Sequence, residues 1–315
     1  MEEILLLDNP EINMMNLWGD GRLAKKYGYR LAEGVDINRT PMGAYFCDDC
    51  VIKNGKYAGK TLGDLYKEDP DYFGTAEERR WEIMPVNMAC MYACESLSIQ
   101  VHPQEEWAQE HLNAHGKSEC WYFADVDAPT YVILGHNART MEELKAYLDR
   151  GDYAGLLRKR PVEKDTFYAI KAGTVHAIQK GCTFIEICNP SPVTYRFYDY
   201  DRLDKDGKPR QLDTEKALEN ILVPDDYIDY DPQIRMSQGL KETFLADNRD
   251  YSAWKYEVDG EGSLSKQKPF AGGYVIEGCA RINGYEVKEG ELFFLSSACK
   301  EVKIQGKAKI LCCNG

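Results

Sequence analysis

The residue types best suited to hold a metal ion gather in one part of this chain of 315 residues. All five histidines lie between His102 and His176, and Glu119 lies between these two. Gln100 stands two positions before His102 in the same strand-like run. Two imidazoles, a carboxylate and an amide oxygen suit a divalent ion such as Zn²⁺, and they leave open positions for water or substrate. These residue types therefore indicate a site for one divalent ion, of the open kind that catalysis requires.

We expect the run 98–103 to be a strand that positions Gln100 and His102. Side chains alternate between the two faces of a strand, so one face would carry polar groups and the other apolar ones. The expected polar face carries Ser98, Gln100 and His102, and the expected apolar face carries Leu97, Ile99 and Val101. Four unrelated polar residues are the alternative, because a lone histidine near a strand end is usually an ordinary hydrogen-bonding group. The remaining histidines, His111, His115 and His136, are expected in loops or on the surface.

The rest of the chain indicates many short strands around a few helices. Thr61 and Thr75 each precede an acidic residue by three positions, which is a helix-start pattern within the turn-rich first 95 residues. Strand patterns then extend from 96 to 202, interrupted by a helix expected from Thr140 to about Gly151. Antiparallel strands at this spacing are typical of a sandwich or a jelly-roll barrel.

A change of composition at 224–239 separates the C-terminal part of the chain. This stretch is acidic and poorly periodic, so we interpret it as a linker. Four strand-like runs follow it, at 274–278, 280–284, 291–295 and 309–311, and this half contains no histidine. The C-terminal half could therefore serve in packing, in a dimer contact or in closing one side of the active cleft.

Composition limits the location and the partners. The acidic start and the lack of an apolar run near the roughly 20 residues of a membrane span indicate a cytoplasmic protein. Eleven cysteines without regular spacing are expected as reduced thiols. A net charge of −13 disfavours nucleic acid and membrane as partners, although a few basic residues could still bind a small phosphate.

Four phrases in the middle of the chain carry a family resemblance. They are Ser-Ile-Gln-Val-His-Pro, Gly-Lys-Ser-Glu-Cys-Trp-Tyr, Ala-Gly-Thr-Val-His-Ala and Thr-Tyr-Arg-Phe-Tyr-Asp-Tyr-Asp-Arg, starting at 98, 116, 172 and 194. The set resembles the type I mannose-6-phosphate isomerases, which are zinc enzymes built on cupin barrels, in their short bacterial form. The likeness extends from 17–19 to 207–210.

Pattern and resemblance together imply a mainly β protein of two cupin (jelly-roll) barrels, with a few short helices in the N-terminal half. Residues 1–230 would form the catalytic cupin domain, with an N-terminal elaboration and a helical insertion. Residues 231–315 would form a second, metal-free cupin-like domain, with a homodimer contact among its roles. The resemblance gives zinc the same ligands that the residue types indicate, which are Gln100, His102, Glu119 and His176.

The resemblance also implies roles for five further residues. Arg196 would stabilise charge on oxygen in an enediol-like transition state, and Ser98 and Arg202 would bind the phosphate of the substrate. Glu186 would lie beside the substrate as a proton shuttle, and Lys117 would lie close to the metal. Four of them have an alternative: a structural ion pair for Arg196, a solvated charge for Arg202 or Lys117, and an exposed strand position for Glu186.

Cys47 and Cys50 are a second candidate pair of metal ligands. Two thiolates need two further ligands to hold zinc, and Cys90 and Cys94 are the available candidates. Their spacing is not the usual two-residue one, and the acidic residues between Cys47 and Cys50 disfavour thiolates. We expect no zinc there.

The resemblance implies isomerisation of an aldose phosphate, with mannose 6-phosphate and fructose 6-phosphate as the first choice. Glu186 or a metal-bound water would move the proton between C2 and C1 through a cis-enediol. Departures from the family at Ala44, Ala89, Pro190 and Pro192 leave the metal ligands unchanged but alter the expected pocket. Two alternatives follow: the same chemistry on another sugar, and a catalytically silent metal-binding cupin that senses a sugar.

Overall fold

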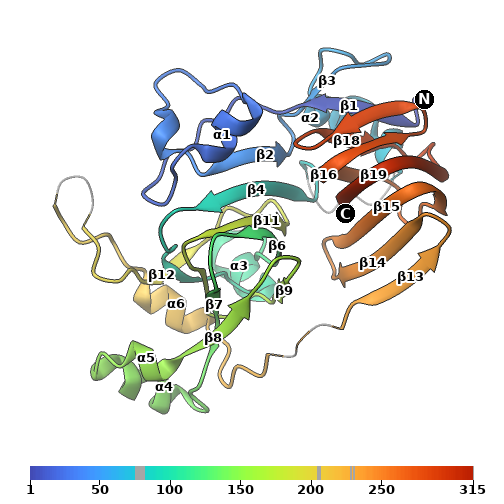
Figure 1. The fold of residues 1–315 in the computed structure, drawn as a ribbon. Helices are drawn as coiled ribbons and strands as arrows, with labels where there is room; N and C mark the ends of the chain where they lie inside the picture. Colours follow the sequence, from blue (N-terminus) through green and yellow to red (C-terminus); the bar gives the residue numbers. More distant parts are fainter. Residues whose placement is uncertain (75–81, 204–206, 228, 230, 315) are drawn as a thin grey trace.

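The computed structural model describes residues 1–74, 82–203, 207–227, 229 and 231–314. Over these residues the chain is mainly β, and its strands form three sheets (Figure 1). The helix start expected at Thr75 lies outside the described residues.

The first sheet carries three of the candidate site residues. Its strand order is β12-β5-β10-β7-β8. These strands are β5 (Ile99–Val101), β7 (Thr130–His136), β8 (Leu157–Val162), β10 (His176–Ile178) and β12 (Tyr195–Tyr198). One face, with Ile99, Val101 and Tyr195, packs against apolar side chains of three helices. These are α4 (Met141–Asp149), α5 (Tyr153–Leu156) and α6 (Thr214–Asn220).

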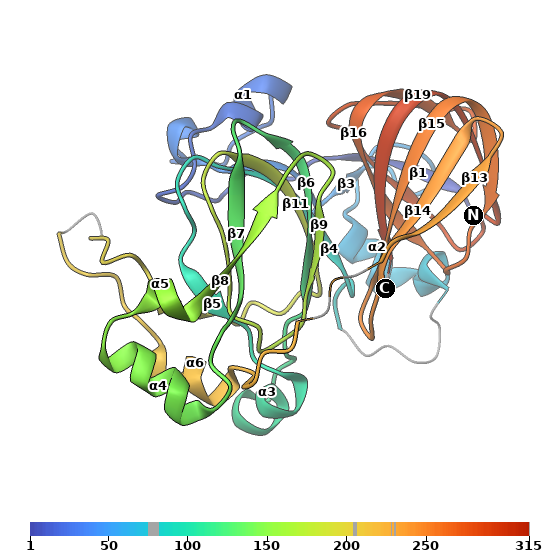
Figure 2. The ribbon, with the colours of Figure 1, turned by 60° about the horizontal axis from the view of Figure 1, so that its bottom comes forward.

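The second sheet lies opposite the other face of the first (Figure 2). Its order is β2-β4-β11-β6-β9. The strands are β2 (Met42–Phe46), β4 (Asn87–Ala93), β6 (Glu119–Val126), β9 (Phe167–Ile170) and β11 (Cys182–Cys188). The core between the sheets includes Trp121 and Phe184 from the second sheet and Leu134 and Ile178 from the first. Burying these large side chains is the main contribution that holds the two sheets together.

The third sheet has nine strands and combines the two ends of the chain. Its path is β13-β14-β15-β19-β16-β18-β1-β3, and β17 pairs with β16. The C-terminal strands are β13 (Gln233–Ser237), β14 (Leu240–Asp247), β15 (Ser252–Ser265), β16 (Ala271–Ile282), β17 (Tyr285–Lys288), β18 (Leu292–Leu295) and β19 (Glu301–Asn314). The N-terminal strand β1 (Ile4–Asp8) lies between β18 and β3 (Val51–Ile52), as Figure 1 shows.

A continuous apolar core joins the second sheet to the third. Phe46 and Tyr122 of the second sheet share it with Tyr274 and Phe294 of the third. Gly272 is required at this contact, because a Cβ atom there would lie 2.3 Å from the Phe46 ring. The expected packing role of the C-terminal half is therefore confirmed.

Local signals place several helices. In α4 the Thr140 side chain accepts a hydrogen bond from the Glu143 backbone N–H, as the sequence predicts. In α2 (Leu62–Glu68) Thr61 forms a complete capping box with Asp64. The other helical segments are α1 (Arg22–Tyr27), α3 (Glu105–Leu112) and the 3₁₀ turns at Ile37–Arg39 and Pro70–Phe73.

Two expectations about the architecture differ from the structure. No sheet closes on itself over the described residues, so two closed barrels are not confirmed. The segment expected as a linker is irregular at its start but ends in a strand, β13, whose five residues are all exposed.

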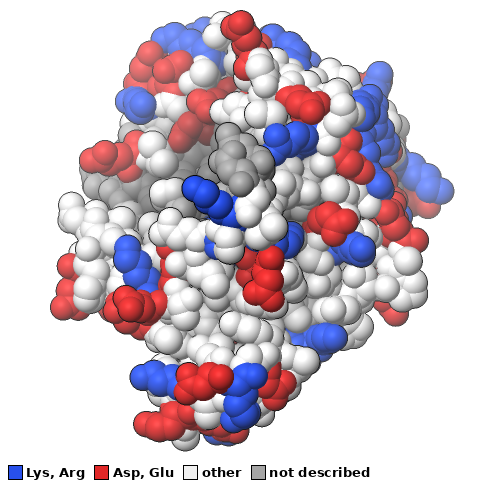
Figure 3. Space-filling model, turned by 90° about the vertical axis from the view of Figure 1, so that its left-hand side faces the viewer, with Lys and Arg blue, Asp and Glu red and all other residues white. Residues whose placement is uncertain are grey.

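Charges are mixed on the surface. Lys and Arg side chains are interspersed with Asp and Glu on the face drawn in Figure 3, and they do not gather into one basic field. Among the helices of the described residues, none is both long enough and apolar enough to span a membrane.

Candidate active site

Two histidines and a glutamate meet in the space between the first and second sheets. His102 directly follows β5, His176 begins β10 and Glu119 begins β6. The Nε2 atom of His102 lies 3.2 Å from Oε2 of Glu119, and Nε2 of His176 lies 3.5 Å from Oε1. Their ligand atoms all lie within 4.8 Å of one another, and the three residues are buried. The structure thus brings together three of the four predicted metal ligands around one point.

Backbone carbonyls fix the orientation of both imidazole rings. Nδ1 of His102 lies 3.0 Å from the Val193 carbonyl, and Nδ1 of His176 lies 2.8 Å from the Thr174 carbonyl. Because a carbonyl only accepts hydrogen bonds, each Nδ1 must carry the proton. In a neutral ring the lone pair is then on Nε2, facing Glu119.

This arrangement fits a cation. Nε2 of His176 and Oε1 of Glu119 are buried and have no hydrogen-bond partner among the described residues. Facing lone pairs on nitrogen and carboxylate oxygen repel each other unless a positive ion lies between them. The structure therefore supports a bound metal at His102, Glu119 and His176.

The electrostatics keep His176 and Glu119 in their metal-binding forms. Burial lowers the pKa of His176 to about 4, so the ring is neutral near pH 7. Burial by itself would raise the pKa of Glu119, but the ammonium group of Lys117 holds it well below its usual range. Glu119 is therefore ionised.

Lys117 connects two carboxylates of the site. Its Nζ lies 2.8 Å from Oε2 of Glu119 and 3.2 Å from Oε1 of Glu186. Burial opposes the charge on Lys117, but the two carboxylates raise its pKa well above the ordinary value. Its alternative reading as a solvated surface charge does not fit, because its side chain is only 12% exposed.

Strand register places Gln100 and Arg196 beside this group. Gln100 pairs directly with His176 on one side and with Arg196 on the other. Residues opposite each other in neighbouring strands share a face, so the three form one row across the first sheet. Glu186 lies in a corresponding row of the second sheet, between Ala89 and Trp121.

The expected alternation holds only within β5 itself. Ile99 and Val101 pack on the helices, away from Gln100. Leu97 instead packs in the core between the sheets, because it precedes the first residue of the strand. The predicted apolar face was thus wrong at Leu97. Ser98 directly precedes β5 and is partly buried.

An unbroken alternation along 194–200 would place Arg196 on one face with Tyr198 and Tyr200, but the strand is not regular here. The register shifts between Arg196 and Tyr198, so Tyr198 pairs with Ile99 and packs on the helix side with Tyr200. Nη1 of Arg196 donates to the Gln211 carbonyl at 2.8 Å. Its Nε is buried and has no partner among the described residues. This N–H remains available for an anion.

The guanidinium group of Arg202 is held by hydrogen bonds to Ser96 and Asp199. Nη1 donates to the Ser96 carbonyl at 2.5 Å, Nε donates to the Asp199 carbonyl at 3.2 Å, and Nη2 donates to the Asp199 carboxylate. Asp199 is buried and also accepts from Nη1 of Arg210 at 3.0 Å. The alternative of a solvated charge at a strand end is therefore wrong for Arg202. The sequence reasoning missed Arg210 and Asp199, because their pairing across a turn leaves no local pattern.

Arg196, which lies in the row with Gln100 and His176, forms a basic group with Arg202 and Arg210. Burial lowers the pKa of Arg196, and the nearby charge of Arg210 lowers it further. Such mutual repulsion among guanidinium groups favours an anion as a neighbour.

Two other expectations about single residues were wrong. His136 is neither a loop nor a surface residue, because it ends β7, is 1% exposed and has Nε2 at 2.8 Å from the Leu222 carbonyl. Ala44 was expected near the pocket but belongs to the core shared with the third sheet. Ala89, by contrast, lies in the core that surrounds the site and pairs with Glu186.

The cysteine pair does not assemble a further group of ligands. Over the described residues, the His102, Glu119 and His176 group is the one set of three or more that could hold an ion. Cys47, Cys50, Cys90 and Cys94 are free thiols, and the Cys50 thiol donates to the Tyr45 carbonyl at 3.1 Å.

Replacing Cys47 and Cys50 together with Ser should leave metal content and turnover nearly unchanged. A serine hydroxyl can still donate to the Tyr45 carbonyl, so the local structure is kept. Metal analysis of the double variant checks this. Loss of a second metal equivalent would show that these thiols bind an ion after all.

Comparison with known proteins agrees with this geometry. Residues 241–314 match the model of the mannose-6-phosphate isomerase cupin domain. The chain is 36% identical over 300 residues to mannose-6-phosphate isomerase ManA of Bacillus subtilis, covering 94% of both chains. It is 31% identical over 299 residues to the mannose-6-phosphate isomerase of Streptococcus mutans, covering 94% of this chain and 93% of that protein.

Solved structures show the same fold. The crystal structure of the mannose 6-phosphate isomerase from Bacillus subtilis superimposes with a TM-score of 0.89 at 29% identity and covers 100% of both chains. A phosphomannose isomerase variant from Salmonella typhimurium, 15% identical with a TM-score of 0.75 and 100% coverage of both chains, shows the shared fold.

The cupin domain, the mainly β fold and the buried ligand group define a sugar-phosphate isomerase of the cupin class. Within this class, the chain belongs to the mannose-6-phosphate isomerase family.

Proposed function

We propose that this enzyme is zinc-dependent and interconverts mannose 6-phosphate and fructose 6-phosphate. The observation that carries the proposal is the convergence of Nε2 of His102, Nε2 of His176 and both oxygens of Glu119 in a buried space. Nitrogen and carboxylate donors of this kind suit Zn²⁺. Gln100 is the fourth proposed ligand, since it pairs directly with His176. One Zn²⁺ per chain would act as a Lewis acid or as a template for sugar oxygens.

The protein's own residues would move the proton. In the open-chain sugar the base removes the hydrogen from C2, which gives a cis-enediol, and returns a proton to C1. The hydroxyl on C2 loses its proton as the carbonyl forms there, and the oxygen on C1 gains one. We propose Glu186 as this base, with Lys117 holding its carboxylate at 3.2 Å.

Basic residues would hold the charged parts of the substrate. We propose that the unpartnered Nε of Arg196 faces the oxygen on which charge develops. Arg202 and Ser98 would bind the phosphate, and Arg210 joins them because it shares Asp199 with Arg202. Asp199 would position the two guanidinium groups rather than touch the substrate.

A different sugar phosphate is the second candidate substrate. Ala89 stands where the family resemblance expects a lysine, and it pairs directly with Glu186, the proposed base. A small apolar side chain there changes both the charge and the space beside the reacting carbons.

A panel of aldose phosphates in a coupled assay tests these proposals. Turnover of mannose 6-phosphate above all others supports the first, and preferred turnover of another sugar phosphate supports the second. Tight sugar binding without turnover would mean a silent sugar-sensing cupin and would contradict both. Free mannose serves as the control for recognition of the phosphate.

Three further features belong to the proposal. The two five-stranded sheets would be the halves of one flattened cupin barrel and the third sheet the second barrel, with the domains dividing near 230. A cytoplasmic location is supported by eleven free thiols in the described part of the chain. A homodimer contact stays a prediction, and size measurement in solution tests it.

A further inference from the structure

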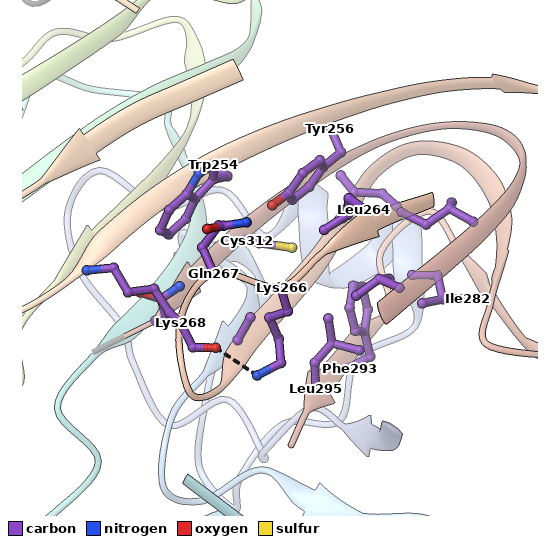
Figure 4. Close-up of a pocket in the computed structure, with 15 residues that line it drawn as sticks. Trp254, Tyr256, Leu264, Lys266, Gln267, Lys268, Ile282, Phe293, Leu295 and Cys312 are labelled. Carbon is purple, nitrogen blue, oxygen red and sulfur yellow. Dashed lines mark hydrogen bonds between the residues drawn. The ribbon is translucent and has the colours of Figure 1, made fainter. Parts of the chain in front are cut away.

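A pocket inside the third sheet is too small to hold a sugar or a cofactor (Figure 4). Apolar side chains such as Trp254 and Phe293 enclose it and leave about 30 Å³ of room, which a few water molecules would fill. The turn 248–251, which connects β14 to β15, has a closer relation to the isomerase site.

Hydrogen bonds within the turn 248–251 fix its shape. The Asn248 side chain accepts from the backbone N–H groups of Asp250 at 2.8 Å and of Tyr251 at 3.0 Å. Tyr251 is 2% exposed and packs in the same apolar core as Cys120 of β6. The turn is thus anchored on the strand whose first residue is the metal ligand Glu119.

Asp250 of this turn accepts a hydrogen bond from a buried asparagine. Nδ2 of Asn189 donates to Oδ2 of Asp250 at 3.2 Å and to the Gly116 carbonyl at 3.0 Å. A carboxylate and a carbonyl only accept hydrogen bonds, so the Asn189 amide must direct its NH₂ group toward both. Asn189 is 1% exposed, and its Oδ1 has no partner among the described residues. The two acceptors therefore set the orientation of this amide.

The segment 115–118 carries Lys117 and is held from two sides. On one side, the Asn189 amide donates to the carbonyl of Gly116, the residue before Lys117. On the other side, the Glu105 carboxylate accepts from the backbone N–H of Gly116 at 2.9 Å. Because both contacts are to Gly116, a rotation of the Asn189 amide would shift the backbone from which the Lys117 side chain starts.

We propose that Asp250 is a positioning residue of the isomerase. Through Asn189 it holds the backbone next to Lys117, and Lys117 in turn holds the carboxylate of Glu186. This inference rests on the proposed function, in which Glu186 is the base. Without the Asp250 carboxylate, one N–H of the buried amide loses its acceptor, which is unfavourable, and the amide is free to rotate. The C-terminal half thereby has a role in catalysis as well as in packing.

Asp250→Ala should lower kcat about tenfold or more and leave KM nearly unchanged, because a misplaced catalytic group affects the chemical step more than binding. Asp250→Asn keeps an acceptor at this place and should recover most of the loss. In the Asn189→Ala background, Asp250→Ala should cause no further loss, since the link is already broken. Steady-state kinetics on the best substrate of the aldose phosphate panel measure all four proteins. A full additional loss in the double variant, or parent kcat in Asp250→Ala, would overturn the proposal.

Asp247→Ala is the matched control. Asp247 ends β14 just before the same turn, but its carboxylate pairs with Lys268 at 3.2 Å, so this variant should keep the kcat of the parent. Every variant should also keep its metal, since none of the changed residues belongs to the ligand group. An equal loss of kcat in Asp247→Ala, or loss of metal in Asp250→Ala, would contradict a positioning role of Asp250.

A second measurement does not require activity. The side chains of Lys117 and Lys309 are each 12% exposed and ion-paired, so acetic anhydride should acetylate both slowly. In Asp250→Ala, Lys117 should react severalfold faster while Lys309 reacts as in the parent, and mass spectrometry of peptides gives both rates. Unchanged acetylation of Lys117 would overturn the inference whatever the activity. Faster acetylation in a protein whose parent turns over no sugar phosphate would support the positioning of Lys117 by Asp250 and contradict the proposed function.

Discussion

His176→Ala should lose nearly all of its bound metal and, with it, isomerase activity. The Nε2 atom of His176 faces Glu119 with no other partner in the described structure, so no nearby group can replace this ligand. His102→Ala should behave in the same way, because its Nε2 faces the other oxygen of the carboxylate. Metal analysis of the purified variants, after dialysis against a trace of chelator, gives the result directly.

His136→Ala is the matched control for this loss. His136 is buried to a similar degree, but its Nε2 lies at the Leu222 carbonyl and outside the ligand group. It should keep a full equivalent of metal even if its melting temperature falls. If His102→Ala and His176→Ala each also keep a full equivalent, the metal lies elsewhere.

Arg196→Ala should lower kcat by about a hundredfold or more, on the scale of deleting one oxyanion donor. An interaction made mainly in the transition state changes kcat, whereas uniform binding of a phosphate changes KM. Arg202→Ala should therefore mainly raise KM and narrow the preference for phosphorylated over free sugar. Steady-state kinetics of both variants on both sugars provide the comparison.

The metal content of Arg196→Ala shows whether its loss of activity is catalytic or follows from a damaged metal site. Arg196→Ala should keep its metal, because Arg196 contacts the Gln211 carbonyl and none of the three ligands in the described structure. Arg196→Lys restores the charge without the planar donor, so partial recovery of kcat is expected. Normal turnover of Arg196→Ala, or unchanged phosphate preference in Arg202→Ala, would show that other basic residues reach the substrate.

The sequence was sufficient to predict those structural features that have a local or regular signal. The cap at Thr140 depends on side chains three residues apart, and the structure contains it. Within β5 the alternation correctly separated Gln100 from Ile99 and Val101. A bulge defeats this reasoning at Tyr198, because one extra residue reverses every later side chain and has no reliable local signature.

Non-local pairings could not be predicted. The contact of Arg210 with Asp199 and the packing of Ala44 on the third sheet depend on how distant segments meet. The strand β13 escaped notice because all its side chains are exposed, so no apolar alternation reveals it. An edge strand of this kind is held by backbone hydrogen bonds to β14, which depend little on the identity of the side chains.

The position of β1 has a consequence for synthesis of the protein. Leu5 and Leu7 pair with Phe294 and Leu292, so this apolar strand leaves the ribosome long before its partner exists. At roughly 5–20 residues per second, it waits ~15–60 s with an edge open to other chains. Nascent chains are therefore exposed to misassociation during most of translation, and a chaperone that binds short apolar segments would act on β1.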